Sequence, residues 1–343
     1  MRAMHIDRIC DIREDPRPLT EVEIPVPEPG SGEVLLKVLA CGVCHTELDE
    51  IEGRTAPPEL PVVPGHEVVG RVVKTGENAT GLTEGQRVGV GWFYSSCGEC
   101  RYCRSGNENL CDDFRATGRD ADGGYAEYMT VPAMAAFPLP DHLEDAQAAP
   151  LLCAGAIGYR SLNLTGIENG DSLGLTGFGG SAHLVLKMVR YRCPDSSVYV
   201  FARNGNERDF ARELGAVWAG DTVEESPEKL RSIIDTTPVW KPVVEAMKNL
   251  APGGRLVVNA IRKENVDRDY LLNLDYARHL WMEREIKSVA NVSPGDISGF
   301  LKLAGEMKVS PEIIEYPLEQ ANRALAELRR GNVRGAKVLT VSA

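Results

Sequence analysis

The segment Gly170-Asp-Ser-Leu-Gly-Leu-Thr-Gly-Phe-Gly-Gly-Ser-Ala182 decides the fold of this chain, because a buried strand in it runs into a glycine-rich turn. A helical segment over 183–191 follows the turn. Glycines let the backbone approach a pyrophosphate, whose charge then lies against the free amides and positive end of the next helix. Ala182 stands where the fingerprint accepts a third glycine or an alanine. The motif alone is weak, but it predicts cofactor contacts at Gly177, Phe178, Gly179, Gly180 and Ser181.

Strands and helices alternate after this turn, which strengthens the interpretation. The predicted strands are Val198–Phe201, Arg231–Asp235, Gly254–Ala260 and Ile286–Val292. The predicted helices are Glu207–Leu214, Pro242–Leu250 and Tyr276–Glu283. Such alternation is typical of a doubly wound parallel sheet, so the sequence predicts an α/β fold with a Rossmann dinucleotide-binding domain over 158–292.

The first ~155 residues have a different character, with frequent glycine and proline and few long helical periods. Short β-like runs occur at Glu33–Ala40, Val68–Val73, Arg87–Val90 and Tyr125–Val131. This pattern predicts a β-rich, barrel-like domain. A chain of 343 residues also exceeds what one hydrophobic core usually supports, which agrees with two domains.

Composition narrows the class of protein. The chain is 43% hydrophobic, and its net charge of −12 argues against binding to nucleic acid, whose phosphates would repel it. We find no apolar run of membrane-spanning length and no signal segment at the start of the sequence, so we expect a cytoplasmic protein without membrane association.

Four of the nine cysteines are closely spaced, at Cys97, Cys100, Cys103 and Cys111. Thiolates at such spacings form a closed tetrahedral zinc site of the structural kind. Disulfides or an iron–sulfur cluster are the alternatives, and the absence of a signal peptide disfavours the first of these.

A second set of metal-ligand residues is dispersed along the chain. Pro61-Val-Val-Pro-Gly-His-Glu-Val-Val-Gly-Arg-Val72 places His66 beside Glu67, while Cys44 lies upstream and Cys153 far downstream. A fold that brought the two thiolates and the imidazole together would form a catalytic zinc site with one open position.

The motifs Cys44-His-Thr46, Gly65-His-Glu67, Asp122-Gly-Gly-Tyr-Ala-Glu127 and Leu151-Leu-Cys-Ala-Gly155, with the cysteine cluster, resemble those of the zinc-dependent medium-chain alcohol dehydrogenases. The resemblance covers essentially the whole chain. It implies two zinc ions and a GroES-like catalytic domain formed by 1–157 and 293–343. It also implies helices near Ile297–Met307 and Leu318–Arg330, a closing strand Ala336–Val341, and a homodimer or homotetramer.

The resemblance further implies roles for individual residues. Thr46 would relay the proton of the alcohol, and Asp49 stands where the family often has a histidine in that relay. Glu67 can approach the metal from behind, and Glu47 would hold the second nitrogen of His66. In addition, Trp92 and Phe93 are expected to line the substrate pocket, although aromatic residues at a strand end also serve as core.

The end of the second Rossmann strand predicts the cofactor. An NAD site places an acidic residue there, whereas this chain has Ala202 followed by Arg203. A guanidinium can bind two oxygens of a 2′-phosphate, and Asn204 and Arg208 are near enough in sequence to assist. The sequence therefore predicts NADP(H) rather than NAD(H), with an exposed loop charge as the alternative role of Arg203.

These observations together predict reversible hydride transfer between NADP(H) and a primary or small secondary alcohol. The same reaction with NAD(H) is the first alternative. A zinc-free quinone or enoyl reductase on the same scaffold is the second, and the Cys/His/Cys set disfavours it. A non-enzymatic binding protein is the third.

Overall fold

The computed structural model describes residues 1–331 and 335–341, and it divides into two units. The first unit contains residues 1–156 and 292–343, and the second contains residues 157–291. Among the described residues, no helix combines the length and the apolar character needed to cross a membrane.

The second unit is built on one six-stranded sheet in which every pairing is parallel. Its strands are β10 (Ser172–Thr176), β11 (Ser197–Phe201), β12 (Trp218–Gly220), β13 (Leu230–Asp235), β14 (Leu250–Val258) and β15 (Glu285–Ser288). The spatial order is β12-β11-β10-β13-β14-β15, so the chain adds strands on one side of β10 up to β12 and on the other side from β13 onward. This order confirms the predicted doubly wound fold and places a topological switch point between β10 and β13.

Helices connect these strands. They are α4 (Gly180–Arg192), α5 (Gly205–Glu213) and α6 (Lys241–Met247), and α3 (Ala154–Thr165) leads into the sheet. Residues of α6 such as Val243 and Met247 are buried with Ile233 and Leu256 of the sheet, which forms a hydrophobic core on that face. Burial of these apolar side chains holds α6 against that face of the sheet.

Two predicted helices in this unit were partly wrong. The helix predicted over Pro242–Leu250 ends at Met247, because Leu250 already pairs with Leu230 as the first residue of β14. The helix predicted over Tyr276–Glu283 is reduced to a five-residue π-helical turn, Tyr276–Leu280. Beyond it Met282 and Glu283 take positive φ angles of 76° and 59°, which no helix accepts.

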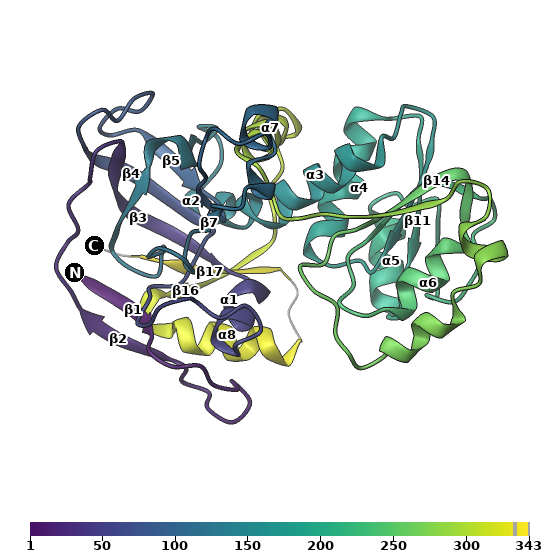
Figure 1. Cartoon of the computed structure of the whole chain (residues 1–343), viewed down its shortest axis with the longest axis horizontal. Helices are drawn as coiled ribbons and strands as arrows, with labels where there is room; N and C mark the ends of the chain where they lie inside the picture. The colour runs from purple at the N-terminus through teal and green to yellow at the C-terminus, as the bar shows by residue number, and fades with distance from the viewer. Residues whose placement is uncertain (332–334, 342–343) are drawn as a thin grey trace. The chain divides into compact units, whose positions relative to one another are not determined.

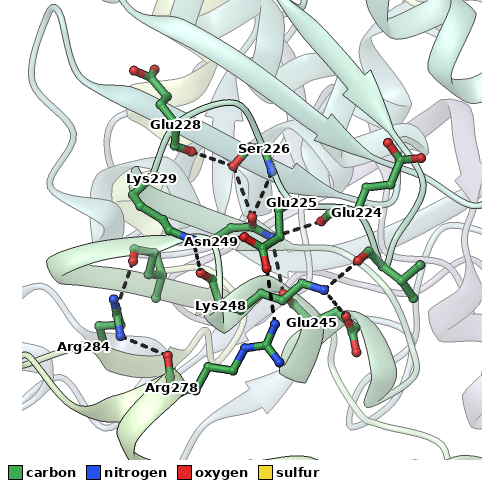
Figure 2. A network of polar contacts seen from close by, with 12 residues as sticks. Glu224, Glu225, Ser226, Glu228, Lys229, Glu245, Lys248, Asn249, Arg278 and Arg284 are labelled. Atoms are coloured by element: carbon green, nitrogen blue, oxygen red, sulfur yellow. Dashed lines mark hydrogen bonds and ion pairs between the residues drawn. The ribbon is translucent and has the colours of Figure 1, made fainter.

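The amino end of β13 is held by a polar network that Figure 2 shows in close-up. Asn249 is fully buried, and its Oδ1 accepts a hydrogen bond from Ser226 N at 3.0 Å. Lys248 Nζ donates to Glu245 and to the Val223 carbonyl, both at 2.6 Å. These contacts join α6 to the segment before β13, at the opposite end of the strand from the glycine-rich turn.

The first unit is β-rich, as predicted. Its strands are β1 (Arg2–Ile6), β2 (Leu19–Glu23), β3 (Glu33–Val43), β4 (Val68–Thr75), β5 (Arg87–Val90), β6 (Phe93–Ser95), β7 (Arg115–Ala116), β8 (Tyr128–Pro132), β9 (Ala136–Pro138), β16 (Ile313–Pro317) and β17 (Ala336–Thr340). Its helices are α1 (His45–Ile51), α2 (Asp145–Ala148), α7 (Pro294–Met307) and α8 (Ala321–Arg330).

A seven-stranded sheet in the order β16-β17-β3-β4-β5-β9, with β8 also on β3, organises this unit. The pairing of β17 with β3 brings the yellow strand β17 of Figure 1 against the dark blue strand β3. The strand predicted from Tyr125 begins only at Tyr128, because the Tyr125 amide instead donates to the Pro64 carbonyl at 3.0 Å. That bond ties Tyr125 to the loop that carries His66.

Candidate metal centres and cofactor site

The loop before β4 holds His66 in one position. Gly65 has φ +102°, and a Cβ there would lie 2.4 Å from the Tyr125 ring and 2.9 Å from Cys41 Sγ, so only glycine fits. The imidazole of His66 is 1% exposed. Its Nε2 is buried and has no hydrogen-bond partner within residues 1–331 and 335–341. A buried nitrogen without a partner is costly unless it serves as a ligand.

The other ring nitrogen of His66 is fully engaged. Its Nδ1 lies 2.6 Å from Glu47 Oε1, which is the contact predicted for Glu47. Glu47 belongs to α1, and its Oε2 accepts the Cys44 amide at 2.7 Å. The carboxylate therefore fixes the imidazole orientation and the residue that begins α1, and Nε2 is left as the free nitrogen.

Two thiols lie beside that nitrogen. Cys44 precedes α1, while Cys153 follows the short turn after α2, and their Sγ atoms are 3.9 Å apart. This is close to the ~3.8 Å edge of a tetrahedron with Zn–S bonds of ~2.3 Å. Ligand atoms of Cys44, His66, Glu67 and Cys153 all lie within 4.8 Å of one another.

The protonation of the two thiols also favours a cation. The hydrogen bond from Cys153 holds the pKa of the Cys44 thiol well below its ordinary value. The same bond, together with burial, raises the pKa of Cys153 well above it. The lowered pKa of Cys44 favours its thiolate, the form of cysteine that binds a metal cation. The donor set fits zinc.

Glu67 lies beside the same ligand atoms. Its side chain is buried, and burial, with the charge on Cys44 adding, raises its pKa well above the ordinary value. A Cβ at Gly42 would lie 1.7 Å from Glu67 Oε2, so Gly42 provides the room for this carboxyl group. Glu67 can therefore reach the ligand cluster without displacing Cys44 or His66.

The four remaining predicted ligands form a separate cluster. Their Sγ atoms are 3.5 to 3.8 Å apart, in the pairs Cys97–Cys103, Cys100–Cys103 and Cys97–Cys111. These separations exceed a disulfide bond of ~2.05 Å and match tetrahedral edges around zinc. All nine cysteines lie within the described residues, and all are free thiols. Backbone amides of Cys100 and Glu99 lower the pKa of Cys97 to about 7, which favours the thiolate.

Of the two predicted relay residues, Thr46 lies beside a metal-ligand candidate and Asp49 is held in an ion pair. Thr46 is half-buried, and its Oγ1 lies 3.6 Å from Cys44 Sγ. Asp49 is buried, and its carboxylate pairs with the Arg54 guanidinium at 2.5 Å. Arg54 was missed at the sequence level, because a contact five residues away across a helix end leaves no periodic signal. The relay role of Asp49 therefore competes with an ion pair.

The predicted pocket aromatics differ in exposure. Phe93 is completely buried and packs edge-on against Phe114 with ring centroids 5.9 Å apart, so it is core in the first unit and the expectation that it lines a pocket finds no support. Trp92 is half-buried, and its ring centroid lies 5.3 Å from that of Phe114.

A fully buried acid, Glu50, was also missed at the sequence level, although its spacing of three from Glu47 on a helix places both side chains on one face.

The glycine-rich turn follows β10 in the second unit. Gly177 has φ +73°, and its amide donates to the Phe201 carbonyl at 2.9 Å. Gly179 precedes α4, and a Cβ there would meet no atom within 4 Å, so its surroundings are open. Phe178 is buried against Phe210. Ser181 lies in the first turn of α4, and the first amides of a helix have no partner within it, which is the arrangement that binds anions in other helices.

The end of β11 carries the residues predicted to select the cofactor. Arg203 is exposed, and its guanidinium makes no hydrogen bond or ion pair to any described residue. The side chain of Asn204 caps α5 by accepting from the Asn206 amide at 2.9 Å. Arg208 instead donates to the carbonyls of Ala202 and Arg203, at 2.7 and 3.1 Å. Its predicted part in phosphate binding therefore competes with these bonds.

Comparisons with known proteins agree with this geometry. The alcohol dehydrogenase GroES-like domain model matches residues 30–141. The probable alcohol dehydrogenase AdhA of Mycobacterium tuberculosis is 42% identical over 95% of this chain and 94% of its own. Among solved structures, a cinnamyl alcohol dehydrogenase from Sorghum bicolor shares 28% identity with a TM-score of 0.82, covering 99% of this chain and 97% of its own. A cobalt- and zinc-bound thermostable alcohol dehydrogenase from Pyrobaculum aerophilum shares 24% identity with a TM-score of 0.84, over 99% of both chains.

A GroES-like unit with a Cys/His/Cys ligand set and a Rossmann-type unit define the class of medium-chain dehydrogenases. The chain belongs to the zinc-dependent medium-chain alcohol dehydrogenase family. Its activity is that of an alcohol dehydrogenase.

Proposed function

We propose that this enzyme oxidises primary or small secondary alcohols reversibly with NADP(H), using one catalytic and one structural zinc per chain. The observation that carries the proposal is the buried, unpaired Nε2 of His66, which points into the same cluster as the thiols of Cys44 and Cys153. When bound there, zinc supplies Lewis-acid polarisation of the alcohol or carbonyl oxygen.

In this proposal, residues of the chain orient the ligand imidazole, move the proton and assist exchange at the open ligand position. Glu47 holds the imidazole of His66 in one orientation. Thr46, next to Cys44, takes the alcohol proton, and Asp49 passes it on when its pairing with Arg54 loosens. Glu67 assists exchange at the open ligand position, and Trp92 lines the substrate pocket. The catalytic domain in this proposal consists of 1–157 and 293–343, and the cofactor domain of 158–292.

The preference for NADP(H) rests on Arg203. Its guanidinium is exposed beyond the end of β11, where a carboxylate would bind the ribose hydroxyls of NAD. The acidic Glu207 lies in the first turn of α5 and supports the alternative with NAD(H) if it reaches the ribose. A charge-assisted hydrogen bond contributes roughly 1.5 to 3 kcal/mol, so Arg203 should favour NADP(H) by about ten- to a hundredfold.

The deciding measurement is kcat/KM with each cofactor, for the native enzyme and for Arg203→Ala. Loss of the NADP(H) preference in the variant is the expected result. Arg212→Ala is the matched control, since Arg212 lies at the far end of α5 and pairs with Asp209. A native preference for NAD(H) would overturn the assignment.

The metal content is tested separately. Elemental analysis of the purified protein should find two zinc ions per chain, and one or none would refute the proposed metal content.

We also propose a homodimer or homotetramer that associates along β15. This strand is the edge of its sheet, and all four of its residues are exposed. Exposed apolar side chains precede it, at Trp281 and Met282. β15 itself carries Ile286 between Glu285 and Lys287, and an unpaired sheet edge can pair with a second copy. Light scattering should give a mass of at least twice 37.4 kDa, and a mass equal to it would refute this assembly.

A further inference from the structure

Lys263 is a nearly buried lysine in the second unit, in the segment that follows β14. Its side chain is only 8% exposed. Its Nζ contacts the carboxylate of Asp235 and donates to the carbonyls of Thr237 and Val239, at 2.6 and 3.1 Å. An ammonium group has three hydrogens to donate, and these three acceptors satisfy it. Burial of such a charge is costly, so its position calls for an explanation.

The carboxylate of Asp235 joins two neighbouring strands. Asp235 is the last residue of β13, and its side chain is fully buried. While Lys263 occupies Oδ2, Oδ1 accepts from Thr176 Oγ1 at 2.5 Å and from Thr237 Oγ1 at 2.7 Å. Thr176 is the last residue of β10. The carboxylate therefore connects the carboxyl ends of β10 and β13, where the switch point of the sheet lies.

The glycine-rich turn packs on the same segment. Thr176 directly precedes Gly177, and its carbonyl accepts from both the amide and Oγ1 of Thr236, at 3.0 and 2.9 Å. A Cβ at Gly177 would lie 3.0 Å from Thr236 Oγ1 and from Thr237 Cγ2. The turn thus contacts Thr236 and Thr237, and Lys263 holds Thr237 from the other side through its carbonyl.

We propose that Lys263 is a positioning residue for dinucleotide binding, which acts through Asp235 and Thr237 to hold the turn at Gly177. The inference rests on the proposed function of this turn as the pyrophosphate site. Lys263 acts in two ways: it fixes the backbone of residues 235–239, and it neutralises Asp235. Without it, a buried carboxylate would remain uncompensated beside a turn that receives an anion.

The test compares Lys263→Met with Lys248→Met in the full-length, zinc-loaded enzyme. Lys248 is the matched control, because it is an 11%-exposed lysine paired with Glu245 at the opposite end of β13 (Figure 2). Calorimetric titration with NADP⁺ and with NAD⁺ gives the dissociation constants. Lys263→Met should raise both by roughly 3- to 30-fold, as for residues that act on a ligand without touching it. The two cofactors should respond equally, because both carry the pyrophosphate.

The control should lose thermal stability without a change in either constant. Hydrogen exchange at the amides of 177–182 should accelerate in Lys263→Met and not in Lys248→Met. If Lys263→Met lowers Tm but leaves the dissociation constants as in the native enzyme, the inference is overturned.

The double variant Asp235→Asn/Lys263→Met covers the case in which the single variant does not fold. It removes both charges, so its dissociation constants should lie between those of the native enzyme and those of the single variant. Where only the double variant folds, its dissociation constants should exceed the native ones. Native constants in a folded double variant would also overturn the inference when the single variant is unfolded. A native enzyme that binds neither dinucleotide would instead refute the proposed function.

Discussion

The two candidate metal centres of the first unit differ in how the chain builds them. The four-cysteine cluster takes all its ligands from Cys97 to Cys111, in short turns. The other centre takes ligands from Cys44, His66 and Cys153, which are separated by up to 109 residues. It also has a buried supporting carboxylate at Glu47, and a second acid, Glu67, within ligand distance.

In the function proposed above, the first centre stabilises the fold and the second takes part in the reaction. A closed set of four thiolates leaves a metal no open position, so its effect is on the loop that it closes. The dispersed set needs a folded sheet before its ligands meet. Loss of a ligand should therefore damage stability in the first case and activity in the second.

The largest expected effect is that of Cys153→Ala on catalysis. Loss of one of three protein ligands removes several kcal/mol of charge stabilisation, so kcat/KM should fall by about a thousandfold or more. The melting temperature should change little, since the sheet forms without this thiol. Cys193→Ala, at a buried cysteine of the second unit, is the control. Native activity in Cys153→Ala would refute a catalytic role for this centre and, with it, the proposed difference in function between the two centres.

Cys100→Ala should have the reverse signature. Loss of structural zinc frees the 97–111 loop and should cost of the order of 3 kcal/mol, which lowers Tm by about 6 to 12 °C for a unit of this size. Below that temperature the zinc-loaded catalytic centre should retain most of its turnover. Calorimetry beside Cys10→Ala, a half-buried cysteine outside both centres, measures the effect. An unchanged Tm would show that the cluster has no structural role.

Thr46→Ala should reduce turnover by about a hundredfold, in the range of a positioned acid–base group. Metal content and Tm should stay native, which separates this effect from ligand loss. Thr46→Ser keeps the hydroxyl and is expected to restore most of the rate. Asp49→Ala tests the next step of the relay: added imidazole should rescue part of its lost rate. An unchanged rate in Thr46→Ala would exclude the hydroxyl from proton transfer.

The smallest effect should come from Glu47→Gln. The amide can still accept a hydrogen bond from His66, but it lacks the charge that raises the basicity of the ring, so zinc affinity at this centre should fall by about tenfold. Competition with a chelator measures the affinity, and the four-cysteine cluster of the same sample is the internal control. Glu50→Gln removes a buried acid of the same helix that makes no bond to His66. If Glu47→Gln, Glu50→Gln and the native enzyme bind zinc with equal affinity, Glu47 does not support the zinc-binding imidazole of His66.

Local patterns predicted much of the fold. The strand at Arg87–Val90 has the bounds expected from its alternation, and the strand at Val198–Phe201 differs by one residue at its start. The errors lie where tertiary contacts override local preference. Leu250 continues an apolar helical period, yet it belongs to β14 because it meets Leu230 across the sheet. The helix ends at Leu280 because Met282 and Glu283 adopt left-handed backbone angles, and neither residue type predicts such angles.

The sequence by itself determined the chemistry that the chain can carry: four clustered thiols, a dispersed Cys/His/Cys set, and a glycine-rich turn without an acid at the end of β11. These are properties of residue type and spacing, which do not change on folding. Only the tertiary structure decided what each side chain does with its charge. Asp49 is engaged by Arg54, Arg208 by two carbonyls, and Lys263 by Asp235. Burial makes an unpaired charge costly, so the packed chain selects such partners whether they are near in sequence, as Arg54 is to Asp49, or distant, as Lys263 is from Asp235.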